Sequence, residues 1–254
     1  MTKVLQVGNR IITAEELIQL LAGYQMLPQL LRELLIDQAI APIECTPEEK
    51  ASACQQFYEK NQLTSEPERQ AWLAHYGMTP EQLEALATRG LRIEKFKQAS
   101  WGNKLESYFL SRKSKLDKVI YSLIRTKEVG IAQELYFRIQ EVEQSFAELA
   151  RQYSQGPEAQ TGGLVGPAEM STPHPALAKM LSVSQPGQVW PPTRLGEWLV
   201  IVRLEKFIPA QLDEPMRRQL LNELFSAWMQ EQLHQLESIR SLVAAGGDRA
   251  ETHQ

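Results

Sequence analysis

The chain has 254 residues, of which 27 are Lys or Arg and 31 are Asp or Glu, so its formal net charge is −4. This slightly acidic balance gives no electrostatic reason to expect a nucleic-acid partner. Hydrophobic residues make up 43%, an ordinary share for a globular protein, but no apolar run reaches the roughly 18 residues that a membrane-spanning helix needs. The first residues also lack the apolar stretch of a signal peptide. We therefore expect a cytoplasmic globular protein without membrane insertion.

Cofactor or metal chemistry is not indicated. The two cysteines, Cys45 and Cys54, stand apart from any CxxC pair or His/Cys cluster, and metal sites and disulfide frameworks depend on such clusters. We expect two thiols in a reducing compartment, with no cofactor and no metal ion.

The N-terminal part is predicted to be mostly helical. The segment VLQVGNRIIT (residues 4–13) alternates apolar and polar residues about Gly8-Asn9, which favours a short β-hairpin. Capping boxes, in which a Ser or Thr hydroxyl and a Glu or Gln three residues later satisfy free backbone N–H groups, indicate where helices begin. They occur at Thr13, Thr46, Ser65 and Thr79. The predicted helices cover residues 14–25, 28–40, 47–61, 66–76 and 80–112, the last with a break near Gly102.

From Lys118 the pattern changes to that of a small α+β domain. KVIYSLIR (118–125) is rich in β-branched and aromatic residues and has the length of a strand, and GEWLVIVRLEKF (196–207) predicts a second, longer strand. The elements between them are predicted helices over residues 131–142, about 145–153 and about 175–182, the glycine loop QTGGLVGPAEM (160–170) and the turn Gln185-Pro186-Gly187.

A last helix begins at LDEP (212–215), where Asp213 is the expected N-cap and Pro215 lies in the first turn. Its apolar residues form a broad stripe, which is typical of a helix that packs on other helices. The N-terminal helices otherwise lack a closing element, so they are favoured over the sheet as its partner. The tail AAGGDRAETHQ (244–254) is predicted to be disordered.

Four segments follow one another in the second half of the chain: SFAELARQYS, TGGLVGPAEM, SVSQPGQVWPP and WLVIVRLEKF. In order, spacing and residue type the span 119–206 resembles the parvulin family of peptidyl-prolyl cis-trans isomerases. The flanks, with VxxVGNRxIT near the N-terminus and RRQLLNELFSAWMQEQL near the C-terminus, look like those of SurA-type chaperones. In that family the N-terminal helices and a C-terminal helix form one chaperone module, with a parvulin domain between them.

Together the two resemblances imply an α+β fold class with a defined division of the chain. A mostly helical, SurA-like domain would cover residues 1–115, and a parvulin-like domain with a small antiparallel sheet and surrounding helices would cover 116–207. A long C-terminal helix over 208–243 would return to the N-terminal domain, and the disordered tail would follow.

The parvulin resemblance also implies a proline pocket beside the glycine loop. In that fold the loop enters a strand next to the pocket, and glycines permit backbone angles that a side chain would forbid. The expected substrate-binding residues are Leu164 and Met170 from the loop, Leu177 in place of the family's pocket phenylalanine, Leu123 on the first strand and His174 at the rim.

The polar groups of catalytic parvulins are replaced here. Members of that family carry two histidines near the pocket floor, with a Cys or Asp nearby. Alignment puts Tyr121 and Val200 at the two histidine positions, and Gln155 or Gly156 at the Cys/Asp position. The positions that match the family's catalytic residues are thus Tyr121, Gln155 and Val200. Arg125 and Arg194 are single charges rather than a cluster, so selectivity for phosphorylated peptides is not indicated.

Two functions from different classes fit these residues. Rotation about an X–Pro bond crosses a barrier of about 18–20 kcal/mol set by amide resonance, and an apolar slot that binds the twisted amide best can lower it without a cofactor. In the first function the protein is a parvulin isomerase and foldase-type chaperone of weak activity, acting on unfolded or proline-containing clients. In the second it is an inactive peptide-binding chaperone or adaptor for the maturation or export of a client peptide. A purely structural adaptor is a third class.

Overall fold

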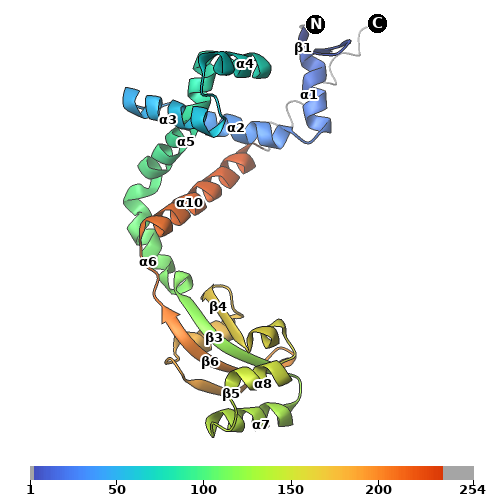
Figure 1. The fold of residues 1–254 in the computed structure, drawn as a ribbon, viewed down its shortest axis with the longest axis vertical. Helices are drawn as coiled ribbons and strands as arrows, with labels where there is room; N and C mark the ends of the chain where they lie inside the picture. The colour runs from blue at the N-terminus through green and yellow to red at the C-terminus, as the bar shows by residue number, and fades with distance from the viewer. Residues whose placement is uncertain (1–2, 237–254) are drawn as a thin grey trace. The chain divides into compact units, whose positions relative to one another are not determined.

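The structure is a computed structural model that describes residues 3–236 of the chain. It divides into two compact units, the first comprising the described parts of Met1–Leu105 and Arg217–Gln254, the second Glu106–Met216 (Figure 1). The second unit is therefore inserted in the sequence between the two parts of the first. It is wider than the predicted 116–207 at both ends. The predicted tail, 244–254, and the end of the predicted C-terminal helix lie outside the described residues.

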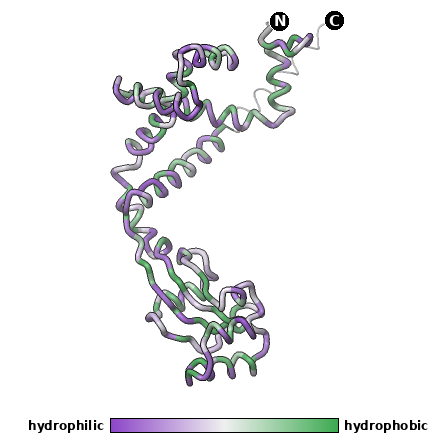
Figure 2. Tube along the Cα trace, viewed as in Figure 1, coloured by the Kyte–Doolittle hydropathy of each residue, from purple (hydrophilic) through white to green (hydrophobic). Residues whose placement is uncertain are grey.

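The first unit is mostly helical, as predicted. It begins with the hairpin β1 (Lys3–Val7) and β2 (Arg10–Thr13), followed by five helices within the described residues. These are α1 (Ala14–Gly23), α2 (Leu27–Ile40), α3 (Pro47–Lys60), α4 (Glu66–Tyr76) and α5 (Pro80–Trp101). At Thr13, Thr46, Ser65 and Thr79 both bonds of the capping box are formed. Figure 2 shows how hydrophilic and hydrophobic residues alternate along these helices. No helix among the described residues is long and apolar enough to cross a membrane.

Helix α10 (Glu214–Gln235) closes the core of the first unit, which confirms the prediction that the C-terminal helix returns to the N-terminal helices. Its buried Phe225 and Met229 pack against Ile36 and Ile40 of α2. A polar contact adds to this core: the buried Lys97 of α5 donates to Asn222 Oδ1 of α10 at 2.6 Å. Apolar packing and this hydrogen bond together join segments that lie more than a hundred residues apart in the sequence.

The second unit contains a four-stranded antiparallel sheet in the order β4-β3-β6-β5. Its strands are β3 (Lys118–Thr126), β4 (Leu164–Glu169), β5 (Val189–Leu195) and β6 (Trp198–Ile208). A short 3₁₀ helix, η1 (Gly102–Lys104), separates α5 from α6 (Leu105–Leu116), so the predicted break near Gly102 is present. Helix α6 then leads into β3. The remaining elements are α7 (Val129–Gln140), α8 (Phe146–Tyr153), η2 (Pro157–Thr161) and α9 (Pro175–Ser182).

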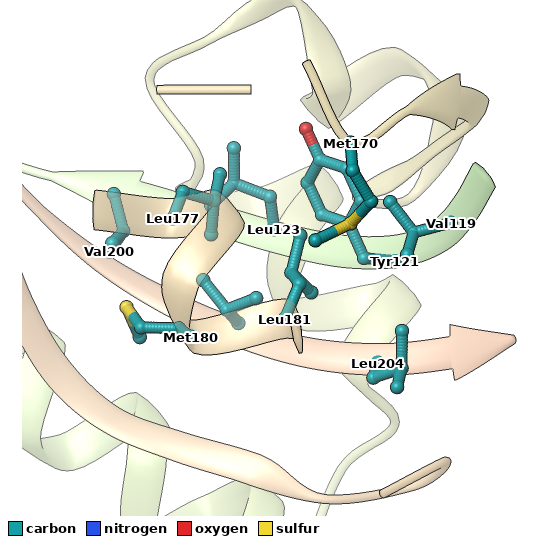
Figure 3. Packing of buried hydrophobic residues seen from close by; sticks show 10 residues of the cluster. Val119, Tyr121, Leu123, Met170, Leu177, Met180, Leu181, Val200 and Leu204 are labelled. Atoms are coloured by element: carbon teal, nitrogen blue, oxygen red, sulfur yellow. The ribbon is translucent and has the colours of Figure 1, made fainter. Parts of the chain in front are cut away.

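The central strands have a core on each face, because successive side chains of a strand point to opposite sides of a sheet. On one face Ile124 of β3 and Ile201 of β6 pack with α7 and α8. The other face carries alternate residues of the same strands, together with α9, and its ten-residue core is drawn in Figure 3. The buried residues of this cluster, the α9-side core, are Val119, Tyr121, Leu123, Met170, Leu177, Met180, Leu181, Val200, Val202 and Leu204.

Candidate peptide-binding cavity

A cavity of about 300 Å³ opens beside the α9-side core. It is lined mainly by apolar side chains, which come from β3, β6, α9, the loop before α9 and the end of β5. The lining residues are Tyr121, Leu123, Arg125, Pro173, His174, Leu177, Leu195, Trp198 and Val200. A proline ring needs an apolar recess of this kind, with a few polar groups beside it.

Strand periodicity explains why these residues converge. Tyr121, Leu123 and Arg125 alternate along β3, and Trp198 and Val200 alternate along β6, so each set lies on one face of its strand. The two strands are paired with Arg125 opposite Val200. The sheet therefore forms one wall of the cavity, while Leu177, at the buried side of α9, contributes a second wall (Figure 3).

Five of the eight residues predicted for the site line this cavity, namely Tyr121, Leu123, His174, Leu177 and Val200. Leu164, Met170 and Gln155 do not. The residues that sequence reasoning missed are Arg125, Pro173, Leu195 and Trp198. For two of these a signal existed: Arg125 and Trp198 each lie two residues from a predicted site residue on the same strand, and an alternation of period two places them on the same face.

The side chain that the glycine loop directs into the core is not the predicted one. Leu164 is 49% exposed, whereas the next residue, Val165, packs against the α9-side core. Because neighbouring strand residues face opposite sides, the apolar position expected for Leu164 is occupied by Val165. Met170 is buried in the same core, close to Tyr121 (Figure 3).

Gly163 shows why this loop requires glycine. Its φ is +84°, and its carbonyl accepts a hydrogen bond from the Leu123 N–H at 2.8 Å, which ties the loop to β3. A Cβ atom at this position would lie 2.9 Å from the Leu123 carbonyl oxygen and 3.0 Å from the Ala150 Cβ. The glycine thus serves both the left-handed backbone conformation and the close approach to the strand.

Arg125, which lines the cavity, forms an ion pair with the buried Glu158. Arg125 Nε donates to Glu158 Oε1 at 2.8 Å and Arg125 Nη2 to Glu158 Oε2 at 2.6 Å, while the Ser154 hydroxyl donates to Glu158 Oε1 at 2.6 Å. The Glu158 side chain is only 3% exposed. A Cβ at Gly156 would overlap both members of the pair. Gln155 takes part through its backbone N–H, which donates to the Arg125 carbonyl at 2.9 Å.

The pKa of Glu158 lies below its ordinary value. Burial alone would raise it, but the hydrogen bonds from Arg125 and Ser154 favour the ionised carboxylate and outweigh burial. Its stabilising contribution is therefore complete above the ordinary carboxyl pKa of about 4.3 and is lost as the pH falls through the lower, folded-state pKa. Glu158 is thus ionised in the folded protein at neutral pH.

We expect Glu158→Gln to make the free energy of unfolding of the second unit less dependent on pH in the acid range. The variant should be less stable than wild type at pH 7, because the charge-assisted bonds to Arg125 are weakened, and the difference should shrink as the pH falls below the ordinary carboxyl pKa of about 4.3. Urea unfolding of both proteins at several pH values measures this. Other carboxylates of the unit titrate in both proteins and cancel in the difference. Parallel profiles would contradict the role assigned to Glu158.

The Tyr121 hydroxyl is a hydrogen-bond donor without a protein acceptor among the described residues. Burial raises the pKa of Tyr121, so the phenol is neutral at physiological pH. No fully buried side-chain nitrogen or oxygen in the described part of the chain lacks a partner, so this hydroxyl is in part accessible to solvent. His174 is the N-cap of α9, where its Nδ1 accepts from the Ala176 N–H at 3.3 Å. The neutral ring then carries its proton on Nε2.

Comparison with known proteins identifies the class of this domain. Residues 125–206 match the family model of the PPIC-type PPIase (rotamase) domain. The second unit is therefore a parvulin-type domain, and the prediction for this part of the chain is confirmed. None of the curated proteins compared with the chain matches it.

Several solved structures are similar to this chain. The PrsA peptidylprolyl isomerase of Bacillus cereus is 17% identical, with 100% of this chain and 93% of that chain covered and a TM-score of 0.45. The parvulin domain of PpiD from Escherichia coli is 26% identical over 39% of this chain and 95% of its own, with a TM-score of 0.34. A SurA-like chaperone of Campylobacter jejuni is 14% identical over 99% of this chain and 100% of its own, with a TM-score of 0.37.

Proposed function

We propose that the protein is a foldase-type chaperone whose parvulin-type domain binds proline-containing segments of unfolded client polypeptides. The observation that supports this most directly is the apolar cavity of about 300 Å³ within a domain of the PPIC type. Leu123, Leu177, Trp198 and Val200 offer a proline ring the apolar contact that it needs. Neutral Tyr121 offers a donor to the peptide backbone.

A separate point is whether the domain also catalyses isomerisation of the proline segment that it binds. Tyr121 and Val200 stand where the resemblance expects histidines, and Val200 has no polar atom in its side chain. Desolvation and shape supply part of rotamase catalysis, so we propose weak isomerase activity. The alternative is a binding-only chaperone or adaptor. A cytoplasmic location also stays a prediction, which cell fractionation tests.

The first unit supports the chaperone part of the proposal. A groove of about 650 Å³ runs over α2, the turn before α5 and α5, with Tyr76, Met78 and Leu86 among its lining residues. Large apolar side chains are exposed on the N-terminal elements, and such surfaces mark sites of protein interaction. They are Leu5, Val7, Ile11, Ile18, Tyr24, Met26, Leu30 and Leu34.

Two assays run in parallel separate the functions. One follows the isomerisation of X–Pro tetrapeptides by coupled proteolysis, against an uncatalysed reaction that takes tens to hundreds of seconds. The other follows the aggregation of an unfolded client. We expect slight acceleration together with clear suppression of aggregation. Suppression without any acceleration would support the binding-only function, and failure in both assays would refute the proposal.

Trp198→Ala is expected to weaken the binding of a proline-containing peptide by about tenfold, because the loss of part of an indole from an apolar wall costs on the order of 1–2 kcal/mol. Isothermal titration calorimetry measures the change. Phe137→Ala is the matched control, since Phe137 is a 61% exposed aromatic residue on α7, which packs on the other face of the sheet. Equal affinities of the wild type and the Trp198 variant would show that the peptide binds elsewhere.

A further inference from the structure

Arg125 presents an open hydrogen-bonding edge at the cavity. Glu158 accepts from Nε and from one N–H of Nη2, which leaves the N–H groups of Nη1 and the second N–H of Nη2. No described residue accepts from these remaining groups. The Arg125 side chain is 29% exposed and lines the cavity, whereas the Glu158 side chain is 3% exposed. Glu158 therefore holds the guanidinium from the protein side, and the remaining donors are left for a ligand.

The charge of this pair decides what kind of ligand group it suits. Arg125 and Glu158 together carry no net charge, so a phosphate or carboxylate ligand would meet the Glu158 carboxylate as well as the guanidinium. A neutral oxygen acceptor meets no such repulsion and still gains a charge-assisted hydrogen bond. Tyr121, a polar residue four positions earlier on the same face of β3, also offers a donor. This part of the cavity is thus suited to a neutral acceptor such as a peptide carbonyl.

The position of Arg125 indicates which carbonyl this is. Arg125 lies opposite Val200 in the strand register and two residues from Leu123, at the edge of the apolar wall. The carbonyl carbon of the residue before proline is bonded directly to the proline ring nitrogen. A ring held against that wall brings this carbonyl within reach of the guanidinium. Building on the proposed function, we propose that Arg125, positioned by Glu158, donates to the carbonyl oxygen of the residue that precedes proline.

This contact has a definite effect on the bound amide. A donor on the carbonyl oxygen stabilises the charge-separated resonance form, which has a double bond between carbon and nitrogen, and that form is planar. The contact therefore strengthens the binding of the planar peptide and gives no help to its rotation. It favours retention of a proline segment over turnover.

The test changes the acceptor atom of the ligand. Wild-type protein is titrated with succinyl-Ala-Ala-Pro-Phe-anilide and with its thioxo counterpart, in which sulfur replaces the carbonyl oxygen before proline. Sulfur is a weaker acceptor, so we expect the oxygen peptide to bind about tenfold more tightly, the range of a hydrogen bond to a charged group. In Arg125→Met this preference should fall to about twofold or less. Glu158→Gln, which loosens the guanidinium, should give an intermediate ratio.

The ratio of the two affinities does not depend on the stability of the variant, because an unfolded fraction of the protein lowers the apparent affinity for both peptides by the same factor. Arg194→Met is the matched control, since Arg194 is exposed on β5 and does not line the cavity; it should keep the full preference. Binding of both peptides with an unchanged ratio in Arg125→Met would overturn this inference alone. Binding of neither peptide by the wild type would overturn the proposed function and this inference with it.

Discussion

Gly163→Ala is expected to destabilise the second unit by about 2–5 kcal/mol. This range sums the strain of a left-handed non-glycine residue, about 1–2 kcal/mol, and the cost of overpacking, about 1–3 kcal/mol. Overpacking arises because the new Cβ would lie 2.9 Å from the Leu123 carbonyl oxygen, 3.0 Å from the Ala150 Cβ and 3.1 Å from the Phe146 ring. The backbone of Leu123 belongs to β3, which is paired with a strand on each side, and cannot move aside alone. Urea unfolding, monitored by hydrogen-exchange mass spectrometry, measures the loss in the free energy of unfolding of the second unit.

Gly187→Ala separates the two causes. Gly187 has the same φ of +84°, but a Cβ there would meet nothing within 4 Å. Only the conformational strain of about 1–2 kcal/mol should remain. Equal effects of the two substitutions would show that the loop can yield at Gly163 and that the close approach to β3 does not matter for stability.

Met229→Ala is expected to destabilise the first unit by about 2–5 kcal/mol, as for other large-to-small changes in a packed core. Met229 is 1% exposed and packs with Phe225, Ile36 and Ile40. Hydrogen exchange should rise in α2 and α10 together, because both helices lose packing partners. Protection in the sheet of the second unit should change little.

Gln230→Ala, at the next residue of α10, is the control, since Gln230 is exposed and alanine has a slightly higher helix propensity. Its effect should stay within about 0.5 kcal/mol. A Met229 variant as stable as this control would contradict the view that α10 completes the helical core.

The extent of the helices and of the two central strands was predictable because it depends on local signals. Capping boxes mark the helix starts, and the alternation of apolar residues in β3 and β6 marks the buried faces. Strand β5 was harder to predict from the sequence, because Pro191 and Pro192 interrupt its pattern and suggest a turn. The structure places β5 at the sheet edge, with an irregular register between Trp190 and Thr193, where missing N–H donors are tolerated.

The candidate site was predictable in part for the same reason. Residues of β3 and α9 could be placed from the family resemblance and strand periodicity, but the contact of Arg125 with Glu158 joins positions 33 residues apart. No periodic pattern links a strand residue to a short turn, and an isolated Glu gives no sign that it will be buried. Whether Val165 or Leu164 faces the core depends on the register of the short edge strand β4. A shift of one residue in that register would exchange the two sides of the strand.

The return of α10 also constrains the order in which the protein can assemble during synthesis. The second unit is a continuous stretch, Glu106–Met216, whereas the core of the first unit contains Phe225 and Met229 from close to the end of the chain. Translation proceeds at about 5–20 residues per second, so the nascent N-terminal helices must wait several seconds with an incomplete interior. The inserted unit has all of its strands before then, and we expect it to acquire protease resistance on the ribosome first.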